Sequence, residues 1–145
     1  MININFNSSI YIWISPTYKF LYVGQTNNKL GIIARAYQHI NIDGTLYQRV
    51  EERIGIELYK VEDLKLLNFP LPNEAKYNRN ESIYRLAVEY LTQKFILEQR
   101  DSFDIKFKVI SNVKSNDLVK NTEVIDIAKQ IILKATKSIN NIEKL

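Results

Sequence analysis

Two short segments with alternating apolar residues, 10–15 and 20–24, are joined by a turn that contains Pro16. In the first segment, isoleucines alternate with Tyr11 and Trp13, which is the period-two pattern of a β-strand. The second segment is also apolar and ends in a glycine, as strands before a turn often do. Because the connection is so short, the two strands can pair only in the antiparallel sense. We therefore expect a β-hairpin to organise the fold.

The same alternation predicts which side chains share a face of this hairpin. If Leu21 and Val23 face the core together with the isoleucines, Tyr11 and Tyr22 lie side by side on the opposite face. Cross-strand tyrosine packing also stabilises hairpins without any chemical role. By strand parity alone, we favour a structural role for this pair.

The rest of the chain predicts a small α+β domain. Helical spacing of apolar residues predicts helices at 29–40, 117–138 and, more weakly, 45–53, and a long helix that begins at residue 80 or 82 and ends near residue 99. Strands are expected at 55–61 and 103–110, and a long loop at 68–80. These elements indicate a small antiparallel sheet with a three-stranded core, flanked by helices and followed by a carboxy-terminal strand and helix. We expect residues 1–112 to form the main domain and residues 113–145 a helical extension packed on it.

Composition excludes several kinds of catalytic site. The chain has 145 residues, no Cys and a single His, which excludes disulfides, a thiolate nucleophile and zinc sites that need Cys or several His. The net charge of +4 permits an anionic partner without establishing one. We see no secretory signal and no apolar stretch of membrane-spanning length, so we expect a cytoplasmic protein with no membrane partner.

Three polar residues lie on the borders of the apolar helix faces and are candidates for a functional site. Arg35 and His39, four residues apart, share one flank of the first helix, where an Arg can bind phosphate and a His can transfer a proton. Glu89 lies at the border of the long helix, and a carboxylate there can bind Mg²⁺ together with water and phosphate. The structural alternatives are a solvated flank for the first two and an Arg85–Glu89 surface pair for the third.

The order of these motifs resembles the GIY-YIG nuclease superfamily. Ile10-Tyr11 in the first strand, Tyr22-Val23-Gly24 in the second, Arg35 with His39 and then a helical Glu89 follow the family pattern. The resemblance covers roughly residues 9–100 and makes residues 1–112 a nuclease-like domain.

The sequence departs from the family pattern at two places. Ser9 stands where the family has its first Gly, so the close packing at the start of the strand can differ. Many members carry an Asn after the Glu helix, and Asn112 is a candidate for that position.

The resemblance implies a divalent-metal-dependent endonuclease that hydrolyses phosphodiester bonds, with DNA favoured over RNA. Glu89 would bind Mg²⁺ or Mn²⁺, and Arg35 would neutralise charge on the phosphate in the transition state. Tyr11 would act as general base or proton relay next to the attacking water. Tyr22 would orient water or phosphate, and His39 would assist as a relay.

Two other functions stay open. One is a nucleic-acid-binding module on the same fold with weak or lost catalysis, and the other is an unrelated α+β protein-interaction domain. In the second case the helix at 117–138 would pair with a partner or with a second copy, although we favour its packing on the domain's own core. A homodimer also stays open, as do the target sequence and the biological role.

Overall fold

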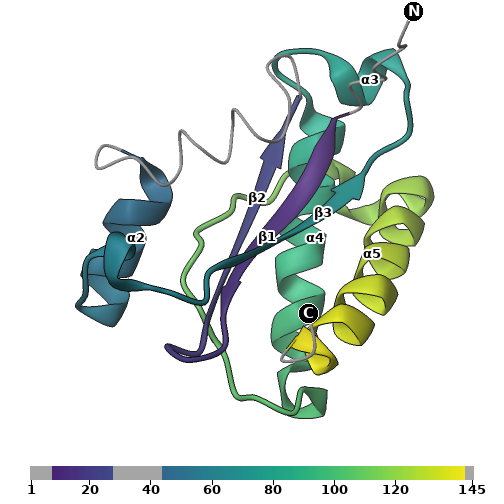
Figure 1. Ribbon diagram of the computed structural model, residues 1–145. Helices are drawn as coiled ribbons and strands as arrows, with labels where there is room; N and C mark the ends of the chain where they lie inside the picture. Colours follow the sequence, from purple (N-terminus) through teal and green to yellow (C-terminus); the bar gives the residue numbers. More distant parts are fainter. Residues whose placement is uncertain (1–7, 28–43, 143–145) are drawn as a thin grey trace, which may run out of the picture.

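The computed structural model describes residues 8–27 and 44–142, and a mixed four-stranded sheet lies at its centre (Figure 1). The strand order is β3-β1-β2-β4. The strands are β1 (Ser9–Ser15), β2 (Phe20–Thr26), β3 (Lys65–Pro70) and β4 (Lys108–Val109). β1 pairs antiparallel with both β2 and β3, whereas β4 runs parallel to β2. The predicted α+β class is confirmed.

Strands β1 and β2 form the predicted hairpin. Their register places Tyr11 opposite Gly24 and Trp13 opposite Tyr22. The two tyrosines are therefore diagonal neighbours on one face, as strand parity predicts.

The turn of the hairpin is anchored from outside by Asp63. Its carboxylate accepts hydrogen bonds from Ser15 Oγ at 2.6 Å and from the Thr17 backbone N–H at 2.7 Å. Lys19 closes the turn with a positive φ of 56°. Asp63 thus fixes the end of the hairpin that lies away from Gly24.

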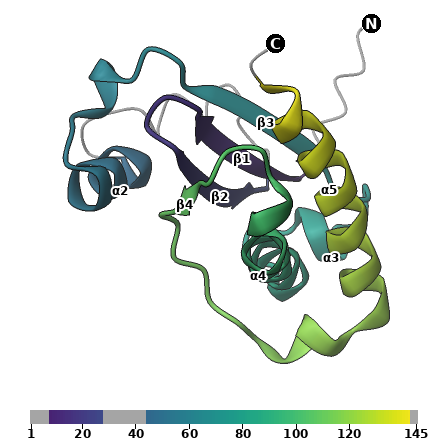
Figure 2. The same cartoon turned by 90° about the horizontal axis from the view of Figure 1, so that it is seen from below.

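Helices bury both faces of the sheet, as Figure 2 shows. Helices α4 (Ile83–Glu98) and α5 (Thr122–Asn140) cover one face and enclose a core that includes Ile10, Ile12 and Val23. On the other face, Leu46 and Val50 of α2 (Thr45–Ile54) pack in a second cluster, which contains both hairpin tyrosines. The tyrosine face is therefore a core surface in its own right.

The two long helices begin at side-chain caps. Ser82 Oγ accepts a hydrogen bond from the Arg85 N–H at 3.0 Å, so α4 begins where the sequence predicts. Asn121 caps α5 in the same way. The buried side chains of α5 belong to the same core cluster as those of β1. No helix in the described ranges is both long and apolar enough to cross a bilayer.

The prediction of the third strand was wrong. Residues 55–61 form a turn and the 3₁₀ helix η1 (Leu58–Lys60), and the strand is β3, which extends into the predicted loop at 68–80. That loop also contains the short helix α3 (Ala75–Asn78). Pro70 ends β3 at the edge of the sheet, where a residue without an N–H donor is tolerated.

The predicted strand at 103–110 was mostly wrong as well. The alternating Phe103 and Phe107 pack edge to face in the main core, with ring centroids 6.5 Å apart, but only β4 pairs with the sheet. Residues 103–105 form bends, and the backbone of this segment pairs with β2 only at Lys108 and Val109. The predicted helix at 29–40 lies outside the described residues.

Candidate active site at the edge of strand β2

The ring of Tyr11 lies against the backbone of Gly24. A Cβ atom placed on Gly24 would lie 2.3 Å from both Cζ and Oη of Tyr11, far inside van der Waals contact. Only a glycine therefore leaves room for this ring. The predicted Tyr-x-Gly segment of the second strand has a direct structural reason, because its glycine accommodates the tyrosine of the first strand.

Both hairpin tyrosines are enclosed by the second cluster. Tyr11 is 2% exposed and Tyr22 is 7% exposed, and their neighbours include Phe20 and residues of α2. The predicted pair is therefore part of the packing between the sheet and α2. Any chemistry at the Tyr11 hydroxyl would take place at Gly24, where the ring ends.

Arg85 of α4 ties the end of β2 to the loop before α4. Its Nη1 donates to the carbonyl oxygens of Tyr77 at 2.5 Å and Arg79 at 2.8 Å, and its Nη2 donates to that of Asn80 at 2.9 Å. Its Nε donates to Gln25 Oε1. These bonds use four of the five guanidinium N–H donors. Because Arg85 is 3% exposed, the interpretation of Arg85–Glu89 as a surface pair was wrong.

A second link joins α4 to β2 two turns further along. Ser111 Oγ donates to Gln93 Oε1 at 2.5 Å, and Gln93 Nε2 donates to the Ser111 carbonyl at 3.2 Å. The Val23 N–H in turn donates to Ser111 Oγ at 2.9 Å. Gln93 is therefore held next to Val23 by way of Ser111.

These two links position Glu89. It lies one helical turn after Arg85 and one turn before Gln93, about 6 Å along the axis from each, on the same side of α4. Since Arg85 reaches Gln25 and Gln93 is linked to Val23, Glu89 lies at the level of the residue between them, Gly24. Glu89 is half-buried, and its turn of α4 lies level with the residue of β2 that the Tyr11 ring contacts.

The electrostatics of this edge couple Arg85 and Glu89. Burial lowers the pKa of the Arg85 guanidinium below its usual range, and the negative charge of Glu89 acts in the opposite direction. Arginine still keeps its charge under such conditions. With most of its donors bound to backbone carbonyls, Arg85 joins α4 to the loop before it and has few donors left for any other partner.

The structure brings only some of the predicted residues to one place. Tyr11 and Tyr22 lie between the sheet and α2, while Glu89 belongs to the helix on the other face of the sheet. The sheet therefore lies between the tyrosines and Glu89, and what Tyr11 and the Glu89 turn of α4 have in common is their level along β2 at Gly24. Arg35 and His39 lie outside the described residues.

The outer edge of β2 is partly covered at this point. β4 pairs with Phe20 and Leu21. At Val23 the backbone N–H donates to the side-chain oxygen Ser111 Oγ and not to a carbonyl of a neighbouring strand. In the described part of the chain, no strand pairs with this edge beyond Val23. The exposed Asn112 directly follows Ser111 and is thus close to the Gln93 end of the site.

The residues present fit a hard divalent cation that has one protein carboxylate as a ligand and takes its other ligands from water and phosphate. Mg²⁺ commonly uses one or two protein carboxylates and completes its shell with water and phosphate oxygens. Glu89 is the carboxylate at this edge, and the amide oxygens of Gln25 and Gln93 already accept hydrogen bonds. Within residues 8–27 and 44–142, no three acidic or His side chains gather into a preformed metal site.

The sequence analysis noted Arg85 beside Glu89 on the helix but missed what Arg85 and Gln93 do. Their spacing of four and eight residues is a readable signal, because it puts all three polar groups in one row. Their partners, Gln25 and Ser111, are 60 and 18 residues away in the chain, and no local pattern announces those contacts.

Comparison of the chain with protein families, with curated proteins and with solved structures found no match.

Proposed function

We propose that this protein is a GIY-YIG-like endonuclease that hydrolyses phosphodiester bonds with Mg²⁺ or Mn²⁺, in DNA more than in RNA. The observation that carries the proposal is that the Tyr11 ring lies against Gly24 while the hydrogen bonds of Arg85 and Gln93 hold the turn of α4 that contains Glu89 level with the same residue. Tyr11 of the first strand, Gly24 of the second strand and Glu89 of the long helix follow one another in the order along the chain that the family resemblance implies.

In this proposal the chain's own residues bind the substrate and move the proton. Glu89 would hold the cation, which when bound supplies a Lewis acid that polarises the phosphate. Tyr11 Oη would receive or relay the proton of the attacking water, and Tyr22 would orient water or phosphate. Arg35 would neutralise negative charge on the phosphate, and His39 would assist as a proton relay.

One observation favours a second candidate function, a nucleic-acid-binding module with weak or lost catalysis. Tyr11 and Tyr22 are almost fully buried, whereas a general base must come within hydrogen-bond reach of the water that it deprotonates. If the tyrosines serve only to pack the sheet on α2, the same surface would bind nucleic acid without cutting it.

Cleavage assays separate the two functions. The purified protein is incubated with supercoiled plasmid, branched DNA or RNA in the presence of Mg²⁺, Mn²⁺ or EDTA. The endonuclease proposal predicts nicked or linear plasmid with either metal and intact plasmid with EDTA. Binding of nucleic acid without cleavage of any substrate would support the module and reject the enzyme.

A further inference from the structure

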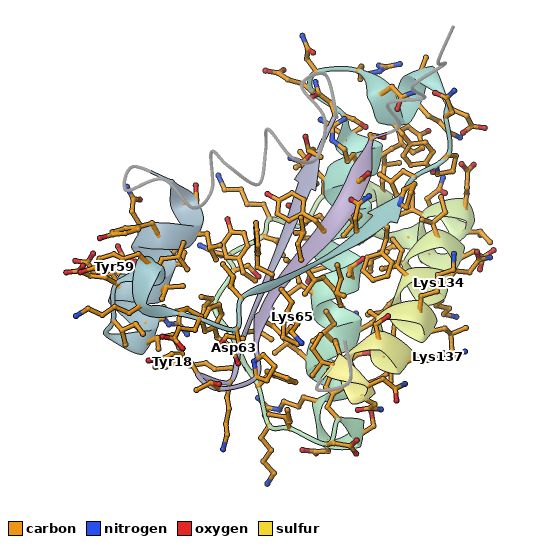
Figure 3. The ribbon with its side chains drawn as sticks, in the orientation of Figure 1. Tyr18, Tyr59, Asp63, Lys65, Lys134 and Lys137 are labelled. Carbon is orange, nitrogen blue, oxygen red and sulfur yellow. The ribbon has the colours of Figure 1, made fainter. Side chains whose placement is uncertain are left out.

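Helix α5 presents a row of lysines to solvent. Lys129, Lys134 and Lys137 are exposed, and Leu133 between them is 72% exposed. These four residues are called the α5 lysine face below. Figure 3 shows Lys134 and Lys137 projecting from α5 away from the body of the domain. The opposite side of the helix is buried in the main core, so this face is the one left for contacts outside the domain.

The α5 lysine face has few acidic neighbours. No Asp or Glu occurs from residue 127 to residue 140, and the acidic residues of α5, Glu123 and Asp126, lie in its first two turns. Glu123 is already engaged by Lys76 at 2.8 Å. Near the last turn, Asp104 approaches through its backbone N–H, which donates to Asn140 at 3.2 Å. None of the three lysines is ion-paired to a carboxylate of the described residues.

The opposite end of the molecule has no such excess of positive charge. Residues 45–60, which form α2 and the segment after it, contain three basic side chains, Arg49, Arg53 and Lys60, and three acidic ones, Glu51, Glu52 and Glu57. Figures 1 and 3 place α2 at the far end of the molecule from α5. A polyanion is therefore attracted more strongly at α5 than at α2, and such an asymmetry orients a charged partner before contact.

We propose that the α5 lysine face binds the phosphodiester backbone of a nucleic acid. Lys129 and Lys137 are eight residues apart, about 12 Å along the helix. Phosphates recur about every 3.4 Å of axis along one DNA strand, so the face spans roughly three of them. This inference rests on the proposed function in one respect, that the partner is a nucleic acid, and it adds the surface that holds it.

Salt-dependent binding tests this assignment without any cleavage step. Affinity for a fluorescent 20-base-pair duplex is measured in EDTA at several salt concentrations for wild type and for the double variant Lys134→Gln/Lys137→Gln. Each lost phosphate contact reduces the slope of log affinity against log salt by about 0.9, so the variant's slope should be smaller by about 2. Lys60→Gln/Lys114→Gln removes the same charge from exposed positions outside α5 and should leave the slope unchanged.

Three results would overturn the assignment. Equal loss of slope in both double variants would show that only net charge matters. An unchanged slope together with a lower melting temperature in Lys134→Gln/Lys137→Gln would mean that these lysines stabilise α5 through its helix dipole and do not contact phosphates. Binding of polyglutamate that depends on Lys134 and Lys137, with duplex binding unaffected, would indicate an acidic protein partner. If the protein cleaves plasmid and one of these three results is found, the α5 assignment is rejected and the endonuclease proposal stands. If the predicted change of slope is found but no plasmid is cleaved, the endonuclease proposal is rejected and the α5 assignment stands.

Discussion

Tyr11 and Gly24 face each other across the β1–β2 pair, and the tyrosine ring occupies the space where a Cβ of residue 24 would stand. This contact fixes the Tyr11 hydroxyl at the backbone of β2. Arg85 and Gln93 bring α4 to the same stretch of the strand from the other face. The proposed site is therefore one strand thick, with the tyrosine on one side and Glu89 on the other.

Replacing Gly24 tests the contact with the Tyr11 ring. Gly24→Ala adds a methyl group in the space that the Tyr11 ring occupies, and this side chain, which is 2% exposed, has little room to move. We expect the free energy of unfolding to fall by about 1–3 kcal/mol, as for other overpacked cores, in urea denaturation.

A double-mutant cycle provides the control for Gly24→Ala. In a Tyr11→Leu background the shorter side chain leaves space for the methyl group, so the alanine should cost clearly less there. An equal cost in both backgrounds would show that the penalty comes from the backbone at residue 24 and not from the ring.

Arg85 should matter for stability far more than a surface arginine. Arg85→Met leaves the carbonyls of Tyr77, Arg79 and Asn80 without their donor, and we expect a loss of about 2–4 kcal/mol in urea denaturation. The matched control is Arg79→Met, since that side chain is exposed and the change should stay within about 0.5 kcal/mol. Similar losses in the two variants would contradict the proposed link between α4 and β2.

The contribution of Asp63 should depend on pH. Partial burial alone would raise its pKa, but hydrogen bonds from Ser15 and Thr17 outweigh this effect and hold the pKa below the usual value. A carboxylate with a lowered folded-state pKa stabilises the protein above its unfolded-state value of about 3.9 and loses that contribution as the pH falls through the folded-state value.

Asp63→Asn tests this expectation. At pH 7 it should lower the free energy of unfolding by about 1–2 kcal/mol, and the difference from wild type should shrink when urea denaturation is repeated near pH 3. Glu62→Gln, at the neighbouring exposed position, serves as the control and should change little. A penalty of the same size at both pH values would mean that the carboxylate charge is not what anchors the turn.

The hairpin and the long helices could be predicted from the sequence because their signals are local. Alternating apolar residues on both sides of a tight turn predict the antiparallel pairing of β1 with β2. The capping residue Ser82 predicts where α4 begins. The strand β3 escaped prediction because Pro70 and the asparagines after it read as a loop. The short apolar run of β3 is a strand because it pairs with β1. The two strands are far apart in the sequence, so a pattern read over a few neighbouring residues does not reveal this pairing.

The candidate site was predictable in its residues but not in its arrangement. Strand parity placed Tyr11 and Tyr22 on one face, yet gave no sign that α2 would bury that face. Helical spacing put Glu89 at the border of its helix, while its position beside Gly24 depends on the distant partners Gln25 and Ser111. Such positions follow from tertiary packing.

Metal-dependent cleavage by Glu89→Gln tests the proposed role of Glu89 most directly. The matched control is Glu98→Gln on the same helix, whose carboxylate makes a surface ion pair with Lys94 at 3.9 Å. With Mg²⁺ and supercoiled plasmid, we expect Glu89→Gln to cut at least roughly 100-fold more slowly than wild type, since losing the metal ligand removes several kcal/mol of transition-state stabilisation. Glu98→Gln should cut at the wild-type rate. Cleavage by Glu89→Gln at the wild-type rate would contradict the proposed site.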